Sequence, residues 1–155
     1  MNMKNKQRHL CKRFCLFIVS IVIGVVCACI ICEVYTVKNL EINTNNMLDI
    51  SKMMIGLWGT VLGFIITAES ILIAFDSGSI TSEFKKTGHY VTVIFQYTQT
   101  SIKLLITILI LVVISVIDKF SMKIFGIFIG LTVMNFVDVL ISLGILYLMM
   151  RMASS

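Results

Sequence analysis

The chain has 155 residues and no proline; 58% of its residues are hydrophobic, 14% are charged, and the formal net charge is +5. Its mean hydropathy of +0.99 is far above what a soluble domain of this size tolerates, because such a domain must cover itself with polar groups. These figures exclude a disordered chain, a secreted disulfide scaffold and an ordinary soluble enzyme. They predict an integral membrane protein of one compact domain.

Four apolar stretches predict membrane spans, since about 20 apolar residues cross roughly 30 Å of hydrocarbon. The predicted spans are approximately 14–32, 53–75, 98–117 and 124–150. The third is uncharged only from Leu104 onward and needs residues 98–103 to reach full length, with Lys103 extending toward the membrane interface. We expect an all-α polytopic fold of four transmembrane helices, because the runs are continuous, whereas barrel strands alternate apolar and polar residues.

The first predicted span, Phe14–Cys32, follows a basic start and in this respect resembles a signal peptide. Its apolar run is longer than the core of a usual signal peptide, so we expect it to stay in the protein as a helix. The cysteines gather in and around it: Cys11, Cys15, Cys27, Cys29 and Cys32. Cys29 and Cys32 form a C-x-x-C pair, but zinc needs two further ligands and none is placed for that role. We therefore interpret the cysteines as small apolar helix residues.

The second predicted span carries small residues along one side. The stripe runs from Gly59 through Gly63 to Thr67 and Ser70, with Gly56 and Thr60 beside it. Such stripes let helix backbones approach closely, although glycine is also common in membrane helices without a special role. Glu69 lies well off the stripe. We expect one face of this helix to pack tightly and the other to carry Trp58, Leu62 and Glu69.

The connection 76–101 is the largest segment predicted on the cytoplasmic side. Residues 76–79 (DSGS) break the preceding helix. No helix breaker follows between Tyr90 and Asp118, so the third helix is expected to begin near Tyr90 and to project beyond the bilayer. The residues that a cytoplasmic protein partner would contact are Phe84, Lys85, Lys86, His89 and Tyr90. The alternative is that this segment packs only against its own neighbours.

The fourth predicted span carries a polar stripe and a second pair of glycines. Asn135, Asp138 and Ser142 are three and four residues apart and share one face of an otherwise apolar helix. Gly126 and Gly130 have the spacing that favours close helix packing. A carboxylate near the bilayer centre costs roughly 2.5–3.5 kcal/mol, so Asp138 is expected to face the bundle interior, water or a partner.

Three interpretations are open for Glu69 and Asp138. They line a water-filled pore or cavity, they bind a proton or cation in a transport cycle, or they are hydrogen-bonded inside the bundle and serve structure only. Because no basic residue lies fully within a predicted span, we do not expect a buried ion pair, although Lys103 reaches partway.

The lysines and arginines predict the orientation, because cytoplasmic segments of membrane proteins are rich in them. One side carries nine basic residues and the other four: Lys4, Lys6, Arg8, Lys12, Arg13, Lys85, Lys86, Lys103 and Arg151 against Lys38, Lys52, Lys119 and Lys123. We predict a multi-pass protein of the inner (plasma) membrane with both termini in the cytoplasm. An even number of spans agrees with this, because it places both termini on the same side. The net charge then reflects this asymmetry and attraction to anionic membrane lipid, and we do not expect direct nucleic-acid binding.

The sequence contains no enzyme signature: it has no phosphate-binding loop, no H-E-x-x-H and no G-x-S-x-G. His9 and His89 lie outside the predicted spans and have no carboxylate or cysteine at ligand spacing. We expect no catalytic residues, no metal and no cofactor.

Gly63–Phe75 (GFIITAESILIAF), followed by Phe84–Gly88 (FKKTG), resembles a pattern in small four-span membrane proteins of bacterial phage-defence systems. The membrane subunit of the Kiwa system and the membrane effectors of nucleotide-signalled systems are examples. The resemblance implies a homo-oligomer that works with a cytoplasmic partner and either senses envelope disturbance or disrupts the membrane. It implies no catalytic residues.

We therefore expect an oligomeric inner-membrane component of a phage-defence system, acting as membrane sensor or pore-forming effector. One alternative is a small ion- or proton-coupled transporter or an accessory membrane subunit. Another is a non-transporting scaffold that anchors a soluble enzyme through residues 76–101. The absence of proline favours straight packed helices over the broken helices of many transporters.

Overall fold

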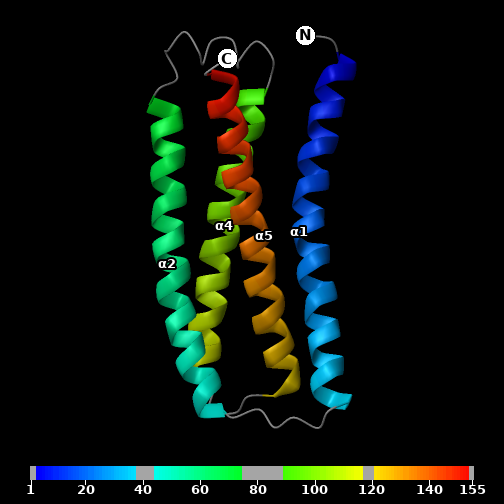
Figure 1. Cartoon of the computed structure of the whole chain (residues 1–155), viewed down its shortest axis with the longest axis vertical. Helices are drawn as coiled ribbons and strands as arrows, with labels where there is room; N and C mark the ends of the chain where they lie inside the picture. The colour runs from blue at the N-terminus through cyan, green and yellow to red at the C-terminus, as the bar shows by residue number, and fades with distance from the viewer. Residues whose placement is uncertain (1–2, 38–43, 75–88, 117–120, 154–155) are drawn as a thin grey trace.

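Four long helices make up the computed structural model, which describes residues 3–37, 44–74, 89–116 and 121–153 (Figure 1). They are α1 (Met3–Val37), α2 (Thr44–Ala74), α4 (His89–Val116) and α5 (Met122–Ala153). Each contains a stretch long and apolar enough to cross a membrane: Phe17–Val37, Asn46–Ala74, Tyr90–Val116 and Lys123–Leu148. The prediction of an all-helical fold with four helices of this kind is confirmed, and the third helix begins at His89, next to the expected start.

The order of the helices in space differs from their order in the chain. α4 packs against α2 on one side and against α5 on the other, while α1 packs mainly against α5. Consecutive helices run in opposite directions, so α1 begins and α5 ends at the same end of the bundle, at the top of Figure 1. We call this the terminal end. α2 therefore lies at one edge of the bundle, and one of its faces has no neighbour among the residues that the structure describes.

The apolar core joins α2 to α4 and reaches α5. Its buried members are Trp58, Ile65, Val93, Tyr97, Leu104, Leu111 and Phe128. Trp58 and Ile65 are seven residues apart, as are Tyr97, Leu104 and Leu111, and this repeat keeps one seam of each helix against its neighbour. Helices in lipid are held together by such packing rather than by the hydrophobic effect, because lipid tails are as apolar as leucine.

Small residues bring α1 and α5 into close contact. A Cβ atom added at Gly24 would lie 2.7 Å from the carbonyl oxygen of Gly130, and one added at Gly126 would lie 2.8 Å from Cys32 Sγ. A Cβ at Gly130 would meet Ala28 Cβ at 3.3 Å. Gly126 and Gly130 therefore sit in a tight helix contact, as their spacing predicts. Their partners, spaced four residues apart on α1, include a cysteine that serves as a small packing residue.

The glycine stripe of α2 does not contact another helix in the described part of the chain. A Cβ atom at Gly56, Gly59 or Gly63 would meet nothing within 4 Å. The face that packs within the chain is the opposite one, which carries the buried Trp58 and the partly buried Leu62. Within the described part of a single chain, bulky side chains fill the α2–α4 seam and leave the small residues of α2 outside it.

Candidate functional site

An ion pair lies inside the bundle, between α4 and α5. Lys103 Nζ is 2.9 Å from Asp138 Oδ2, and the two side chains are 7% and 0% exposed. The ammonium also donates to Ser20 Oγ of α1 at 2.7 Å. Side chains of α1, α4 and α5 therefore meet at the ammonium group of Lys103. This corrects two expectations: Lys103 does not extend to the interface, and a buried ion pair does form.

The first helix supplies further support for the ammonium group. Lys103 Nζ lies 4.4 Å from the centroid of the Phe17 ring and 3.5 Å from the Phe17 carbonyl oxygen. An aromatic face and a carbonyl dipole both attract a cation, most strongly where water is excluded. Such contacts reduce the cost of burying a lysine, which is severe when the charge is unpaired.

A polar stripe on α4 explains why Lys103 turns inward. The buried polar side chains of this helix are Gln96, Gln99, Thr100, Lys103 and Thr107, which recur at intervals of three and four residues. They therefore occupy one helix face, and that face meets α5 and α1. The periodicity is present in the sequence, but the interpretation of Lys103 as a residue that extends toward the membrane interface missed the stripe.

Hydroxyl groups continue the polar cluster toward the terminal end. Thr100 Oγ1 and Ser142 Oγ are 3.0 Å apart, and Tyr97 donates to the Ser142 carbonyl oxygen at 3.2 Å. Ser142 Oγ is 2.9 Å from the carbonyl oxygen of Asp138. Asn135, Asp138 and Ser142 are all fully buried. They share one inward face of α5, as their spacing predicts.

Several polar atoms next to the ion pair have no partner among the residues that the structure describes. They include Asp138 Oδ1, both amide atoms of Asn135 and Thr107 Oγ1. Thr107 is one turn beyond Lys103 on α4, and Asn135 is just under one turn before Asp138 on α5. Because the helices are antiparallel, both residues are displaced away from the terminal end, by about 6 and 4.5 Å of helix rise. Buried polar groups normally have partners, so this region is chemically suited to hold water, a proton or a small cation.

Glu69 belongs to a different helix contact. Its Oε1 lies 2.5 Å from Thr98 Oγ1, which is also 3.0 Å from the Ile94 carbonyl oxygen. Thr98 is exposed and Glu69 is partly buried, at the edge of the α2–α4 seam. Thr98 and Lys103 are five residues apart, which turns them about 140° from each other around α4. The structure therefore does not bring Glu69 and Asp138 together in one chain.

The predicted partner-binding segment is described only in part. Phe84, Lys85 and Lys86 lie outside the described residues, as does the side chain of His89. Tyr90 donates to the carbonyl oxygen of Leu72 at 3.2 Å, so it joins the start of α4 to the end of α2. Among the described residues there is no group of three or more His, Cys, Asp or Glu side chains that could hold a metal ion.

No family model matches the chain, and no curated protein or solved structure matches it significantly. The functional argument therefore depends on two features of the chain itself. One is the cluster around Lys103 and Asp138, and the other is the open face of α2.

Proposed function

We propose that the chain is the membrane unit of a homo-oligomer in bacterial antiviral defence, where it acts with a cytoplasmic partner as membrane sensor or pore-forming effector. The observation that carries the assembly is the open face of α2. A stripe on this face consists of exposed residues at intervals of three and four: Asp49, Lys52, Gly56, Thr60, Gly63, Thr67, Ser70 and Ala74. From Gly56 to Ala74 every member of the stripe is small, and large exposed side chains such as Leu57, Phe64 and Ile71 lie beside it.

The chemistry of this face suits contact with another helix. Thr60 bonds to the Gly56 carbonyl oxygen at 3.0 Å, Thr67 to that of Gly63 at 2.8 Å, and Ser70 to that of Ile66 at 2.8 Å. The hydroxyls are thus satisfied by their own helix and lie flat on it. A helix with such a surface can approach a second copy closely, as in small-xxx-small contacts between membrane helices.

In the pore-forming version of this proposal, α2 and not Asp138 lines the conducting path. Asp138 is fully buried and paired inside its own chain, so exposing it requires the bundle to open. The hydroxyls of α2 already face outward. In this version Asp138 serves structure only, as a side chain that is hydrogen-bonded inside the bundle.

The role in defence and the orientation have separate support. The resemblance of Gly63–Phe75 and Phe84–Gly88 to membrane proteins of phage-defence systems supports the role. The common end of α1 and α5 (Figure 1) and the bias of basic residues support an inner-membrane protein with both termini in the cytoplasm.

The assembly is tested by native mass spectrometry of the protein in lipid nanodiscs or mild detergent. Gly63→Leu should reduce the oligomer to smaller species, because a large side chain separates the facing helices. Gly144→Leu is the matched control, since Gly144 of α5 also has nothing within 4 Å of an added Cβ. A strictly monomeric wild-type protein, or equal effects of the two substitutions, would contradict the assembly through α2.

The defence role is tested in cells infected with phage. Gly63→Leu should remove the protection, and Gly144→Leu should not.

The unpartnered atoms beside the ion pair favour a second candidate function, proton- or cation-coupled transport. Asp138 Oδ1, Asn135 and Thr107 would then bind the transported ion or the water that conducts a proton. Flux into proteoliposomes tests this. Asn135→Leu should abolish flux while the oligomer persists, whereas the leading proposal predicts that Gly63→Leu abolishes both.

A further inference from the structure

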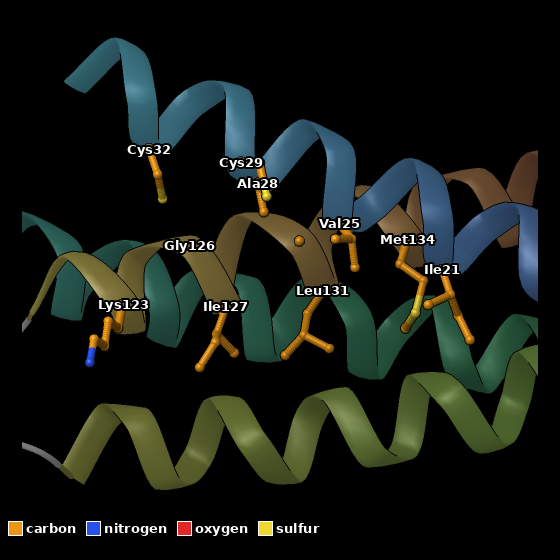
Figure 2. A pocket seen from close by; sticks show the side chains of 11 residues that line it. Ile21, Val25, Ala28, Cys29, Cys32, Lys123, Gly126, Ile127, Leu131 and Met134 are labelled. Carbon is orange, nitrogen blue, oxygen red and sulfur yellow. The ribbon is translucent and has the colours of Figure 1, made fainter. Parts of the chain in front are cut away.

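An apolar groove runs along the contact between α1 and α5, away from the terminal end (Figure 2). Its volume is about 540 Å³. Figure 2 shows side chains of α1, among them Ile21 and Val25, directed toward α5, and Ile127 and Leu131 of α5 beside them. Apart from Lys123, every lining residue is apolar or a cysteine. The groove is therefore suited to a hydrocarbon chain that carries a polar group at one end.

The length of the groove corresponds to one leaflet of a bilayer. Along α5 it extends from Lys123 to Met134, which is about 16 Å at 1.5 Å per residue. Half of a hydrocarbon core of roughly 30 Å is about 15 Å. Lys123 is the first residue of the apolar stretch Lys123–Leu148, so it stands at the level of the lipid headgroups when α5 crosses the membrane.

The charge at the mouth of the groove is available to a ligand. Lys123 is exposed and forms no ion pair with any residue that the structure describes. Lys103 is paired with Asp138, and Lys52 lies 3.9 Å from Asp49. We propose that this groove binds one acyl chain of an anionic phospholipid, with the lipid phosphate held by Lys123.

The dimensions favour a lipid chain over a helix of another protein. A helix with its side chains is a stiff cylinder about 10 Å across. An acyl chain is narrower and adapts to the irregular wall that the branched side chains make. Attraction between a lysine at the membrane surface and an anionic lipid raises the affinity for that lipid about fivefold.

Native mass spectrometry tests the headgroup part of the proposal. The full chain in mild detergent is mixed with equal amounts of phosphatidylglycerol and phosphatidylcholine that carry the same acyl chains. The wild type should retain phosphatidylglycerol about fivefold more, and Lys123→Gln should remove this preference. Lys52→Gln is the control, because Lys52 lies in the first third of α2, a helix that begins at the same end of the bundle as α5 (Figure 1), and does not line the groove. No preference in the wild type, or equal losses in both variants, would overturn the role of Lys123.

Filling the groove tests the acyl-chain part. Val25→Trp and Ile127→Trp each place an indole in the groove and should at least halve the amount of either lipid retained. Val113→Trp on α4 is the control, because Val113 is also exposed but does not line the groove. Circular dichroism shows whether each variant folds, and two groove variants guard against the failure of one. Unchanged lipid retention in a folded groove variant would overturn the site. The proposal concerns a single chain, so it stands or falls independently of the oligomer.

Discussion

Lys103 of α4 and Asp138 of α5 form a buried ion pair with an Nζ–Oδ2 distance of 2.9 Å. Ser20 and the Phe17 ring add contacts from α1, so the pair, which joins α4 to α5, also contacts α1. A buried pair of this kind adds little net stability when intact, but the loss of one partner leaves an uncompensated charge.

Asp138→Asn should therefore destabilise the protein by about 3–5 kcal/mol, because Lys103 loses its counter-ion. The double variant Lys103→Met/Asp138→Leu replaces both charges by apolar groups of similar size and should recover most of that loss. Thermal unfolding of the purified proteins in one detergent measures both. Equal stability of Asp138→Asn and the wild type would show that the pair has no such role.

Asn135→Leu should leave stability unchanged or raise it slightly, because the amide of Asn135 has no hydrogen-bond partner among the described residues and removing an unsatisfied group is favourable. The same thermal measurement applies. A loss above about 1 kcal/mol would mean that bound water or an ion satisfies the amide, which favours the transport function over the leading proposal.

Gly24→Ala should destabilise the α1–α5 contact by about 1–3 kcal/mol, since the added Cβ would stand 2.7 Å from the Gly130 carbonyl oxygen. Backbone atoms yield less readily than a flexible side chain. Gly144→Ala, at an open position of α5, provides the comparison and should cost nothing measurable. If both variants unfold at the same temperature, the close approach of α1 and α5 does not stabilise the position of α1.

Glu69→Gln should preserve the fold and the oligomer, because the amide oxygen of glutamine still accepts a hydrogen bond from Thr98. The free energy of unfolding should change by less than about 1 kcal/mol. Ion flux into vesicles supplies the second readout. A protein that remains assembled but loses coupled uptake would assign Glu69 to transport.

The helices were predictable because hydropathy is a local property, and a long apolar run in lipid has few conformations other than a helix. The shared face of Asn135, Asp138 and Ser142 followed from spacing alone. The partner of Asp138 did not, because Lys103 stands directly before the third uncharged run, a position that predicts a residue at the membrane interface. Whether such a lysine turns inward depends on what the neighbouring helices offer it.

The choice of helix partners was also beyond the sequence. Gly59 and Gly63 have the same spacing as Gly126 and Gly130, yet in the described part of the chain only the second pair packs against another helix. The difference arises because α1 presents small residues opposite α5, whereas bulky Trp58 and Ile65 attach α2 to α4 by its other side. A packing motif specifies a surface, and the rest of the bundle decides what meets it.

The contacts of α1 and Lys103 constrain the order in which the protein can be completed during synthesis. α1 leaves the ribosome before the other three helices, but its main neighbour, α5, leaves after them. Lys103 likewise precedes Asp138 by 35 residues, and an unpaired lysine in lipid costs roughly 2.5–3.5 kcal/mol. We therefore expect α4 to remain at the translocon until α5 has been synthesised. The two helices then enter the bilayer together, and α1 packs against the α4–α5 hairpin afterwards.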